Sequence, residues 1–405
     1  MGIGRNIYFV ARRFDENSGS YAGFIEKFSK FASKNGYKIT IFCTGPNKKT
    51  KKERTAYGTI YSFPISKIKI PLIGMNNDYL SLARHVRRFF KKRHIFHDDI
   101  IIANGRAAYG LPRKKKYLLR MGQPALTFLK NMEIAKKEVS ILSRIARFIH
   151  FNVQYFIEAS CVKRADAFLM PSVETRNLIV NYYGGKRKPY FVPFSGVDSK
   201  YFKKGTGINI EGRNLLFIAA GSEKIRKGIM HLERVLPAIF SKYEDVNLIH
   251  VGEKFKWNVP GWCKKRIISV GKISWEQMIS YYASADMLVS CALNEGFPNI
   301  FLEAMAAGTP IVSSDIQGVR EYLTHKKEGY IFKRGDLKDM ERGISYMLSR
   351  PEIRKKMGAA VSSKAKILFY ESYYNHLLKF INESLFDRNK KSVNLLQLAR
   401  NKKRK

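Results

Sequence analysis

Two glutamates, Glu295 and Glu303, stand close together in the segment 294–310. An apolar run before this segment predicts a strand, Pro298 is suited to the start of a helix, and Gly308 is suited to its end. The free N–H groups of a helix that begins here would attract a phosphate. One of the two carboxylates could then hold the hydroxyl groups of a sugar, and the other those of a ribose.

Two other interpretations of this glutamate pair stay open. Paired carboxylates can be the acid and the base of a glycosidase, although such an enzyme has no need for a helix N-terminus aimed at a phosphate. Glu303 taken alone could be an ordinary surface residue, because glutamate is favoured in the first turn of a helix. The length of the whole string favours a binding site over either alternative.

The string from Glu295 to Pro310 resembles the E-x7-E signature of the retaining GT-B glycosyltransferases of family 4. Other segments are similar to motifs of that family and follow in its order; they are 165–167 with 171–172, 193–198, 284–286, and Gly318 with Glu321. The resemblance covers the chain to about residue 386. It implies an α/β protein of the GT-B fold, in which two doubly wound Rossmann-like domains face a central cleft and a C-terminal helix crosses back to the first domain.

In this family the second domain binds a nucleotide-sugar donor and the first domain binds the acceptor. The resemblance implies that Glu303 holds the ribose, that Glu295 acts at the transferred sugar, and that Lys227 acts at the leaving diphosphate. A cation there stabilises the negative charge that develops on the leaving group. The remaining candidates are, for the donor, Gly296, Phe297, Pro298, Asn299, Ser222, Lys224, Arg226, Lys272 and Ile273, and, for the acceptor or phosphate side, Gly19 and Arg120.

The sequence departs from the family pattern at two charged positions. An arginine usually precedes the phosphate-binding lysine, but Gly221 and Ser222 occupy its place, so Lys224 or Arg226 would have to take its role. A histidine usually follows the strand in the middle of the first domain. Arg120 stands there instead, where it could contact a phosphate or the acceptor.

Two further features concern the glycines after the first strand and the absence of a metal-binding motif. Only Gly19 remains of the paired glycines that the family places after the first strand. No D-x-D motif occurs in the chain, so we expect Lys227 and the dipole of the following helix to act in place of a divalent metal ion. The expected co-substrate is a UDP- or GDP-sugar, with no metal and no other cofactor.

Apolar runs alternate with helical patterns throughout the chain, which is the order that parallel sheets with right-handed crossovers require. Strands are expected near 7–10, 38–43, 100–103, 117–119, 167–171, 190–193, 215–218, 246–251, 267–270, 287–290 and 310–312. The expected division is an acceptor domain at 1–202, a linker at 203–213, a donor domain at 214–363, a crossover helix at 364–387 and a basic tail at 388–405.

The 405 residues include 74 Lys+Arg and 33 Asp+Glu, a net charge of +41. Residues 1–200 carry 38 basic and 13 acidic side chains, residues 201–387 carry 28 and 20, and residues 388–405 carry eight and none. Such a field attracts anionic lipid, an acidic glycan or nucleic acid, although no nucleic-acid-binding motif occurs. Solvated lysines without a partner are the alternative. The amphipathic stretch 82–90 could contact a membrane or simply pack on the first sheet.

The chain has no apolar run of the ~20 residues that a membrane span needs, and its start lacks the apolar core of a signal peptide. Its four cysteines form no C-x-x-C pair, which argues against a disulfide framework and a zinc site. We therefore expect a cytoplasmic protein that is peripheral at the inner face of the membrane.

The function expected from these features is a retaining transfer of sugar from a nucleotide-sugar to a lipid-linked, glycolipid or polysaccharide acceptor at a membrane surface. The alternatives are a catalytically inactive GT-B protein that binds polyanions, and a soluble glucan synthase or phosphorylase of the same fold.

Overall fold

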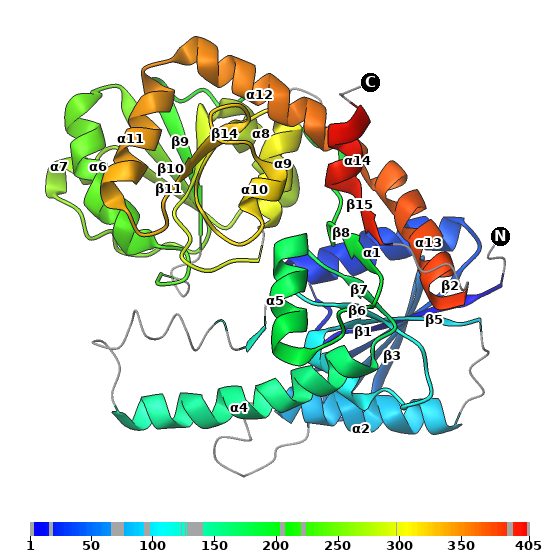
Figure 1. Cartoon of the computed structure of the whole chain (residues 1–405). Coiled ribbons are helices and arrows are strands. Elements are labelled where there is room, and N and C mark those ends of the chain that lie inside the picture. The colour runs from blue at the N-terminus through cyan, green and yellow to red at the C-terminus, as the bar shows by residue number, and fades with distance from the viewer. Residues whose placement is uncertain are drawn as a thin grey trace. The chain divides into compact units, whose positions relative to one another are not determined.

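The structure is a computed structural model, and it describes residues 4–15, 19–65, 77–92, 98–122, 124–125, 127, 141–202, 207–219, 224–296, 298–386 and 392–402. The chain forms two compact units. The first comprises Met1–Ser195 and Glu371–Asn394, and the second comprises Gly196–Tyr370 and Leu395–Lys405. Each unit has its own sheet with helices around it, so the expected α/β class is confirmed (Figure 1).

The first sheet has the order β15-β8-β7-β6-β5-β1-β2-β4-β3. Its strands are β1 (Asn6–Val10), β2 (Lys38–Gly45), β3 (Lys51–Thr55), β4 (Gly58–Pro64), β5 (Ile100–Asn104), β6 (Leu118–Arg120), β7 (Ala167–Leu169), β8 (Tyr190–Val192) and β15 (Val393–Asn394). All neighbours are parallel except β3 and β4, which form an antiparallel hairpin. This hairpin is not among the strands expected from the sequence.

The helices of the first unit are α1 (Gly19–Lys34), α2 (Asn77–Lys92), η2 (Gly105–Gly110), α4 (Ile141–Arg164), α5 (Val173–Tyr183) and α13 (Tyr370–Phe386). On one face of the sheet, Phe28 and Phe31 of α1 contact the ring of Tyr374 in α13. Because parallel crossovers are right-handed, the strand order places α2, η2, α4 and α5 on the opposite face. The helix expected to cross back to the first domain therefore does so as α13.

The second sheet has the order β11-β10-β9-β12-β13-β14, and all its neighbours are parallel. Its strands are β9 (Arg213–Ile218), β10 (Val246–Val251), β11 (Ile267–Gly271), β12 (Met287–Ser290), β13 (Ile311–Ser314) and β14 (Gly329–Phe332). The helices around it are η4 (Ser199–Phe202), α6 (Ile229–Lys242), α7 (Gly261–Lys264), α8 (Trp275–Ser284), α9 (Asn299–Ala307), α10 (Val319–Tyr322), α11 (Leu337–Leu348), α12 (Pro351–Ala365), η6 (Lys366–Leu368) and α14 (Leu395–Lys402).

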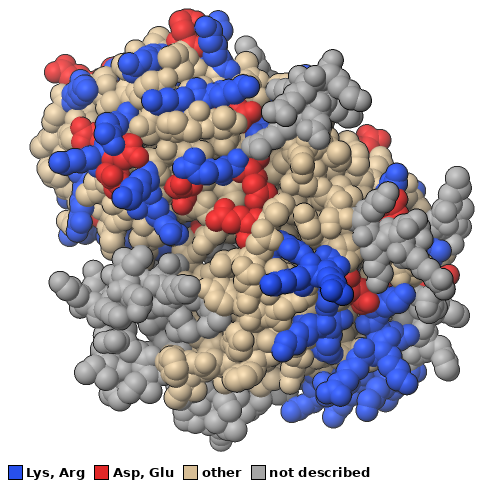
Figure 2. Space-filling view, in the orientation of Figure 1, with Lys and Arg blue, Asp and Glu red and all other residues tan. Residues whose placement is uncertain are grey.

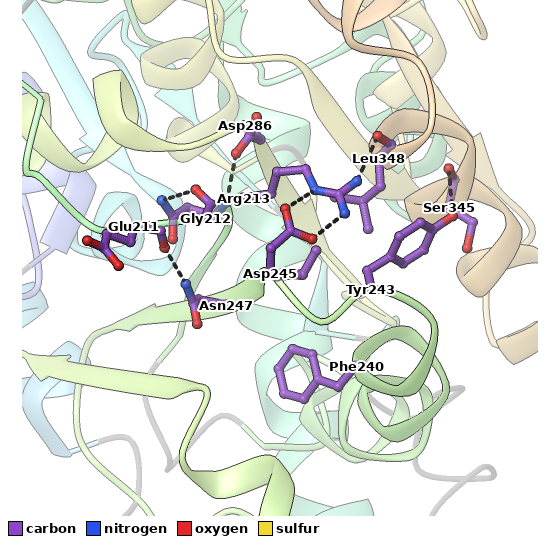
Figure 3. Close-up of polar contacts among 12 residues, drawn as sticks. Glu211, Gly212, Arg213, Phe240, Tyr243, Asp245, Asn247, Asp286, Ser345 and Leu348 are labelled. Carbon is purple, nitrogen blue, oxygen red and sulfur yellow. Dashed lines mark hydrogen bonds and ion pairs between the residues drawn. The ribbon is translucent and has the colours of Figure 1, made fainter.

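Side-chain contacts hold the amino-terminal edge of the second sheet together (Figure 3). Arg213, which begins β9, donates from Nε to Asp245 Oδ2 at 2.7 Å and from Nη1 to the carbonyl oxygen of Leu348 at 3.1 Å. The backbone N–H of Asn214 donates to Asp286 Oδ2 at 2.7 Å. These contacts leave the charged groups of the amino edge paired with one another. A ligand site is expected at the opposite, carboxyl edge, where open α/β sheets bind their ligands.

The domain boundaries differ from those expected. The units divide after Ser195 rather than after residue 202, and the segment expected as a linker, 203–213, ends inside β9 of the second unit. The helix expected at 364–387 is interrupted, because α12 ends at Ala365 in the second unit and α13 begins at Tyr370. The segment expected as a basic tail contains β15, which pairs with β8, and α14, which buries Leu395 and Leu396.

No helix in the described parts of the chain is both long and apolar enough to cross a bilayer.

Candidate active site

The carboxyl ends of β9 and β12 lie side by side in the middle of the second sheet. From this pair the strand order runs outward in both directions, through β10 and β11 on one side and through β13 and β14 on the other. Such a reversal is a topological switch point, where open α/β sheets bind their ligands in a crevice. The loops that follow β9 and β12 contain most of the predicted donor-binding residues.

A close approach of two backbones brings Lys227 to this crevice. Gly228 has a φ of 66°, and a Cβ there would lie 2.0 Å from the carbonyl oxygen of Cys291, so the position requires glycine. The Cys291 thiol lies 3.2 Å from the carbonyl oxygen of Lys227, to which it donates. The N–H of Leu293 donates to the carbonyl oxygen of Arg226 at 2.9 Å. These contacts join the β9 loop to the β12 loop.

The joined loops form an ion cluster around Glu295, which is 6% exposed. Its Oε1 accepts a hydrogen bond from Lys227 Nζ at 2.7 Å and another from Arg226 Nη1. Its Oε2 is buried and has no hydrogen-bond partner among the described residues. The cluster therefore combines two cationic side chains with one carboxylate, whose Oε2 faces no hydrogen-bond partner among the described residues and could accept from a hydroxyl group.

Lys224 does not belong to this ion cluster. Its Nζ lies 3.2 Å from Glu233 Oε2, and the other oxygen of Glu233 accepts from the backbone N–H of Asn258 at 2.8 Å. Of the two side chains that could replace the missing arginine, Arg226 is thus the one that lies beside Lys227 and Glu295. Ser222, another predicted donor-binding residue, lies outside the described residues.

Glu303 lies in α9 and is oriented by a tyrosine that the sequence analysis missed. The hydroxyl of Tyr282, a buried residue of α8, donates to Glu303 Oε2 at 2.8 Å. Tyr370 is a second missed neighbour, since burial together with the charges of Glu303 and Asp198 raises the pKa of its hydroxyl. Neither tyrosine is spaced from Glu303 in a way that a sequence pattern could indicate.

The N-terminus of α9 lies at the same edge of the sheet. The helix begins at Asn299, and its N-cap residue, Pro298, provides no side-chain cap. The first N–H groups of such a helix can bind a ligand, although that of Phe301 already donates to the carbonyl oxygen of Pro298 at 3.0 Å. Gly296 is buried just before this start, and Phe297 lies outside the described residues.

Two predicted donor-binding residues, Lys272 and Ile273, follow the carboxyl end of β11. Lys272 is exposed and Ile273 is half-buried. Because β11 is separated from β9 only by β10, both residues lie at the same edge of the sheet as the ion cluster. Their place at this edge is consistent with their prediction as donor-binding residues.

Arg120 ends β6 in the first unit and is 5% exposed. Its Nη1 donates to Asn104 Oδ1 at 3.2 Å, and its guanidinium carbon lies 3.9 Å from the ring centroid of Phe194 and 4.5 Å from that of Tyr21. Its Nε and Nη2 have no hydrogen-bond partner among the described residues. Burial lowers the pKa of this arginine to about 10. A buried guanidinium with unused donors is suited to an anionic ligand.

Gly19, the other candidate of the first unit, begins α1 after the carboxyl end of β1. In the first sheet, β1 and β5 are the strands at which the order reverses, and Arg120 ends the strand next to β5. Gly19 and Arg120 thus follow strands at the ligand-binding edge of their own sheet. Among the residues that the structure describes, no group of three or more His, Cys, Asp or Glu side chains is arranged to hold a metal ion.

Residues 202–364 match the family described as "Glycosyl transferases group 1". The matched part of the chain contains the ion cluster and Glu303. The fold of the whole chain is GT-B. It is similar to that of sucrose-phosphate synthase from Thermosynechococcus elongatus, with a TM-score of 0.73 and 15% identity over 94% of this chain and 98% of the other. It is also similar to that of WaaG, a glycosyltransferase involved in lipopolysaccharide biosynthesis. The TM-score is 0.66 and the identity 14%, and the match covers 93% of this chain and 99% of WaaG.

Curated relatives match over a shorter region. A phosphatidyl-myo-inositol mannosyltransferase of Mycobacterium leprae is 31% identical over 155 residues, which are 37% of this chain and 41% of the relative. An uncharacterized glycosyltransferase of Methanocaldococcus jannaschii is 26% identical over 177 residues, which are 42% of this chain and 44% of the relative. The chain thus spans less than half the length of these curated relatives.

Proposed function

We propose that this protein is a retaining glycosyltransferase that transfers a sugar from a nucleotide-sugar to a lipid-linked, glycolipid or polysaccharide acceptor at a membrane surface. The observation that carries the proposal is the ion cluster of Arg226, Lys227 and Glu295 at the β9–β12 switch point. Two cationic side chains beside a helix N-terminus suit a diphosphate.

In the proposed donor complex, Lys227 and Arg226 bind the diphosphate together with the first N–H groups of α9. The unused Oε2 of Glu295 accepts a hydrogen bond from a hydroxyl of the transferred sugar. Glu303, oriented by Tyr282, accepts hydrogen bonds from the ribose hydroxyls. When the bond between the anomeric carbon and the phosphate oxygen breaks, the electron pair remains on the diphosphate, and the two cations stabilise it in place of a metal ion.

Relatives of the same fold support the choice of donor. Solved structures with TM-scores of 0.62 and 0.66 to this chain hold UDP-glucose in an Anabaena protein and UDP-2-fluoro glucose in an Escherichia coli protein. We accordingly propose a UDP- or GDP-sugar as the donor. Retention of configuration is proposed from the resemblance of the segment 295–310 to family 4.

The membrane acceptor is proposed on charge and on one group of relatives. The mycobacterial relatives are mannosyltransferases of phosphatidyl-myo-inositol by their names. Residues 1–200, which carry a net +25, form most of the unit that would bind the acceptor. In this proposal Arg120 binds an anionic group of the acceptor, and the protein is peripheral at the inner face of the membrane.

The test is nucleotide release from UDP-, GDP- and ADP-sugars, measured with and without a lipid extract as acceptor. We expect turnover of one donor, and Glu303→Ala should lower it by ~10²-fold or more, because losing a charged hydrogen-bond partner costs about 2–3 kcal/mol. Glu352→Ala, at an exposed position of α12, is the matched control and should leave turnover unchanged. Turnover that depends on inorganic phosphate instead of a nucleotide-sugar would indicate a phosphorylase. Neither turnover nor donor binding would indicate an inactive GT-B protein that binds polyanions.

A further inference from the structure

We infer that the first unit docks on an anionic lipid bilayer through one defined surface, the outer faces of α4 and α2. The inference deepens the proposed function by naming the surface that reaches a membrane acceptor, although docking itself requires no transfer reaction. The docking face, as this surface is called below, consists of Phe148, Ile149 and Phe156 in α4 and Arg84, Arg87 and Arg88 in α2.

The apolar part of the docking face is a stripe on α4. Phe148 is 62% exposed, Ile149 40% and Phe156 69%, which makes the two phenylalanines the most exposed large apolar side chains among the described residues. Side chains seven or eight positions apart lie on one face of a helix. The other face of α4 is buried, as Ile157 and Cys161 show. Contiguous apolar side chains in water mark an interaction site.

The charged part of the docking face is on α2, whose inner side is apolar. Leu82, Val86 and Phe90 are buried, so the amphipathic stretch 82–90 packs on the sheet through its apolar residues. Its arginines are exposed on the other side, and Lys91 and Lys92 extend this basic row.

The basic row of α2 is not neutralised by its own helix. Asp78 is the one acidic residue of α2, and it is buried and paired with Arg12. The exposed charges of the helix therefore have a single sign. A surface of this kind is complementary to anionic headgroups.

The two helices cover the same face of the first sheet, with η2 between them. Arg106 of η2 links them, since its guanidinium carbon lies 4.5 Å from the ring centroid of Tyr79 in α2 and its Nε lies 3.7 Å from Glu158 Oε1 in α4. Figure 1 draws α2 and α4 along one side of the unit, and Figure 2 shows basic side chains gathered beside uncharged surface on that side. The outer faces of both helices thus point away from the sheet in the same direction.

An anionic bilayer fits both parts of this surface together. Phenylalanine and isoleucine side chains enter the boundary between headgroups and acyl chains, while arginines remain at the level of the phosphates. Each basic residue near such a surface contributes on the order of a fivefold increase in partition coefficient. A neutral protein partner would match the apolar stripe but would leave the basic row without a counter-charge.

The experiment measures flotation of the full chain with vesicles of phosphatidylcholine alone and of equimolar phosphatidylcholine and phosphatidylglycerol. The wild-type protein should float with the anionic vesicles. The double substitution Phe148→Ser/Phe156→Ser and the triple substitution Arg84→Gln/Arg87→Gln/Arg88→Gln should each lower partitioning by on the order of 10-fold or more.

The second unit supplies matched controls for these variants. Trp262→Ser removes an exposed apolar side chain of α7, and Lys338→Gln/Lys355→Gln/Lys356→Gln removes three exposed charges of α11 and α12. These variants should float like the wild type. Equal losses in the triple lysine variant would overturn the inference, because net charge alone would then account for docking.

Two more readouts distinguish docking from self-association and from catalytic activity. Sedimentation without vesicles shows whether the wild-type protein self-associates. If the wild type formed an oligomer, the phenylalanine double variant were a monomer, and that variant still floated like the wild type, the stripe would be a contact between copies. This result would overturn the inference. Donor turnover without vesicles should be the same in the docking variants as in the wild type. If the protein floated through the docking face but turned over no donor, the inference would be supported and the proposed function would be refuted.

Discussion

At the scale of single residues, Glu295 pairs with two cations in the free protein and is proposed to bind the sugar in the donor complex. In the free protein its carboxylate pairs with both Lys227 and Arg226, which are needed to bind a diphosphate. A bound diphosphate would compete with Glu295 for the same hydrogen-bond donors. The carboxylate would then be released toward the sugar, through the oxygen that has no partner among the described residues.

This competition predicts an unusual ligand response for Glu295→Gln. The variant should lose about 1–3 kcal/mol of unfolding free energy, because two partly buried cations lose their carboxylate. Addition of UDP should then raise its melting temperature more than that of the wild type, since the diphosphate restores the missing charge. Differential scanning calorimetry measures both effects. Glu233→Gln, which removes the carboxylate paired with Lys224, is the control and should show no additional response to UDP.

Arg120 is a second residue at which stability and function oppose each other. Its pKa of about 10 lies below the ordinary value of 12.5 because burial penalises the charged form. The unfolded chain therefore binds this proton more tightly than the folded chain does. At neutral pH, Arg120 lowers the unfolding free energy. This unfavourable contribution decreases only as the pH rises through about 10, where the folded form loses the proton. Such a charge is retained where it serves a ligand.

We predict that Arg120→Met leaves the unfolding free energy unchanged or raises it by up to about 2 kcal/mol, and that transfer to the acceptor is lost while donor binding persists. Urea unfolding and donor titration test the two halves. Arg164→Met should instead lower the unfolding free energy, because Arg164 donates hydrogen bonds to the carbonyl oxygens of Ala108 and Leu111. A marked loss of stability in Arg120→Met would mean that the buried guanidinium stabilises the free protein.

At the scale of elements, the candidate site depends on how closely the start of α6 approaches the end of β12. The approach is possible because Gly228 has no Cβ and adopts a left-handed conformation next to the carbonyl oxygen of Cys291. Lys227 is adjacent in sequence to this contact. The contact therefore positions the amine that pairs with Glu295.

Gly228→Ala should separate the two loops and move Lys227 away from Glu295. We expect donor turnover to fall by ~10-fold or more and unfolding free energy to fall by about 1–3 kcal/mol, since the new methyl group would overlap backbone atoms and the residue would be held at positive φ. Gly261→Ala in α7 is the matched control, because a Cβ there meets no atom within 4 Å. If Gly228→Ala kept full turnover, the approach would not be what positions Lys227.

At the scale of the whole molecule, each unit contains segments from two parts of the chain. After the first segment of the second unit ends at Tyr370, α13 returns to the first unit. There Tyr374 contacts Phe28, and the hydroxyl of Tyr373 donates to the carbonyl oxygen of Pro193 at 3.0 Å. β15 then pairs with β8 at the end of the first sheet. The fold of the first unit is therefore incomplete until the end of the chain has been made.

This organisation predicts that residues 1–195 alone will not form a stable monomer, because the apolar surface normally covered by α13 is exposed. Fusion of residues 371–394 to that fragment through a Gly/Ser linker should restore a monomer that unfolds cooperatively. Size-exclusion chromatography and urea unfolding provide the measurements. A fusion with the same 24 residues in scrambled order should fail to rescue. A monomeric, cooperatively folded fragment without residues 371–394 would contradict the prediction.

Much of this protein could be predicted from local patterns in the sequence. Strands such as β5 and β12 are short apolar runs, and the string 295–310 carries its own helix start and helix end. The β3–β4 hairpin was missed because β3 is an exposed edge strand of charged residues, so no apolar periodicity marks it. The break between α12 and α13 was missed because apolar residues continue across it.

The partners within the site were decided by tertiary structure. The sequence offered Lys224 and Arg226 equally, and only the fold directs one to Glu233 and the other to Glu295. It also gave no sign that Tyr282 orients Glu303. Residue type and short spacing determine which helices and strands form, because those depend on neighbours in the chain. Which charged groups meet depends on crossovers that bring together residues far apart in sequence, and only the assembled sheet defines those contacts.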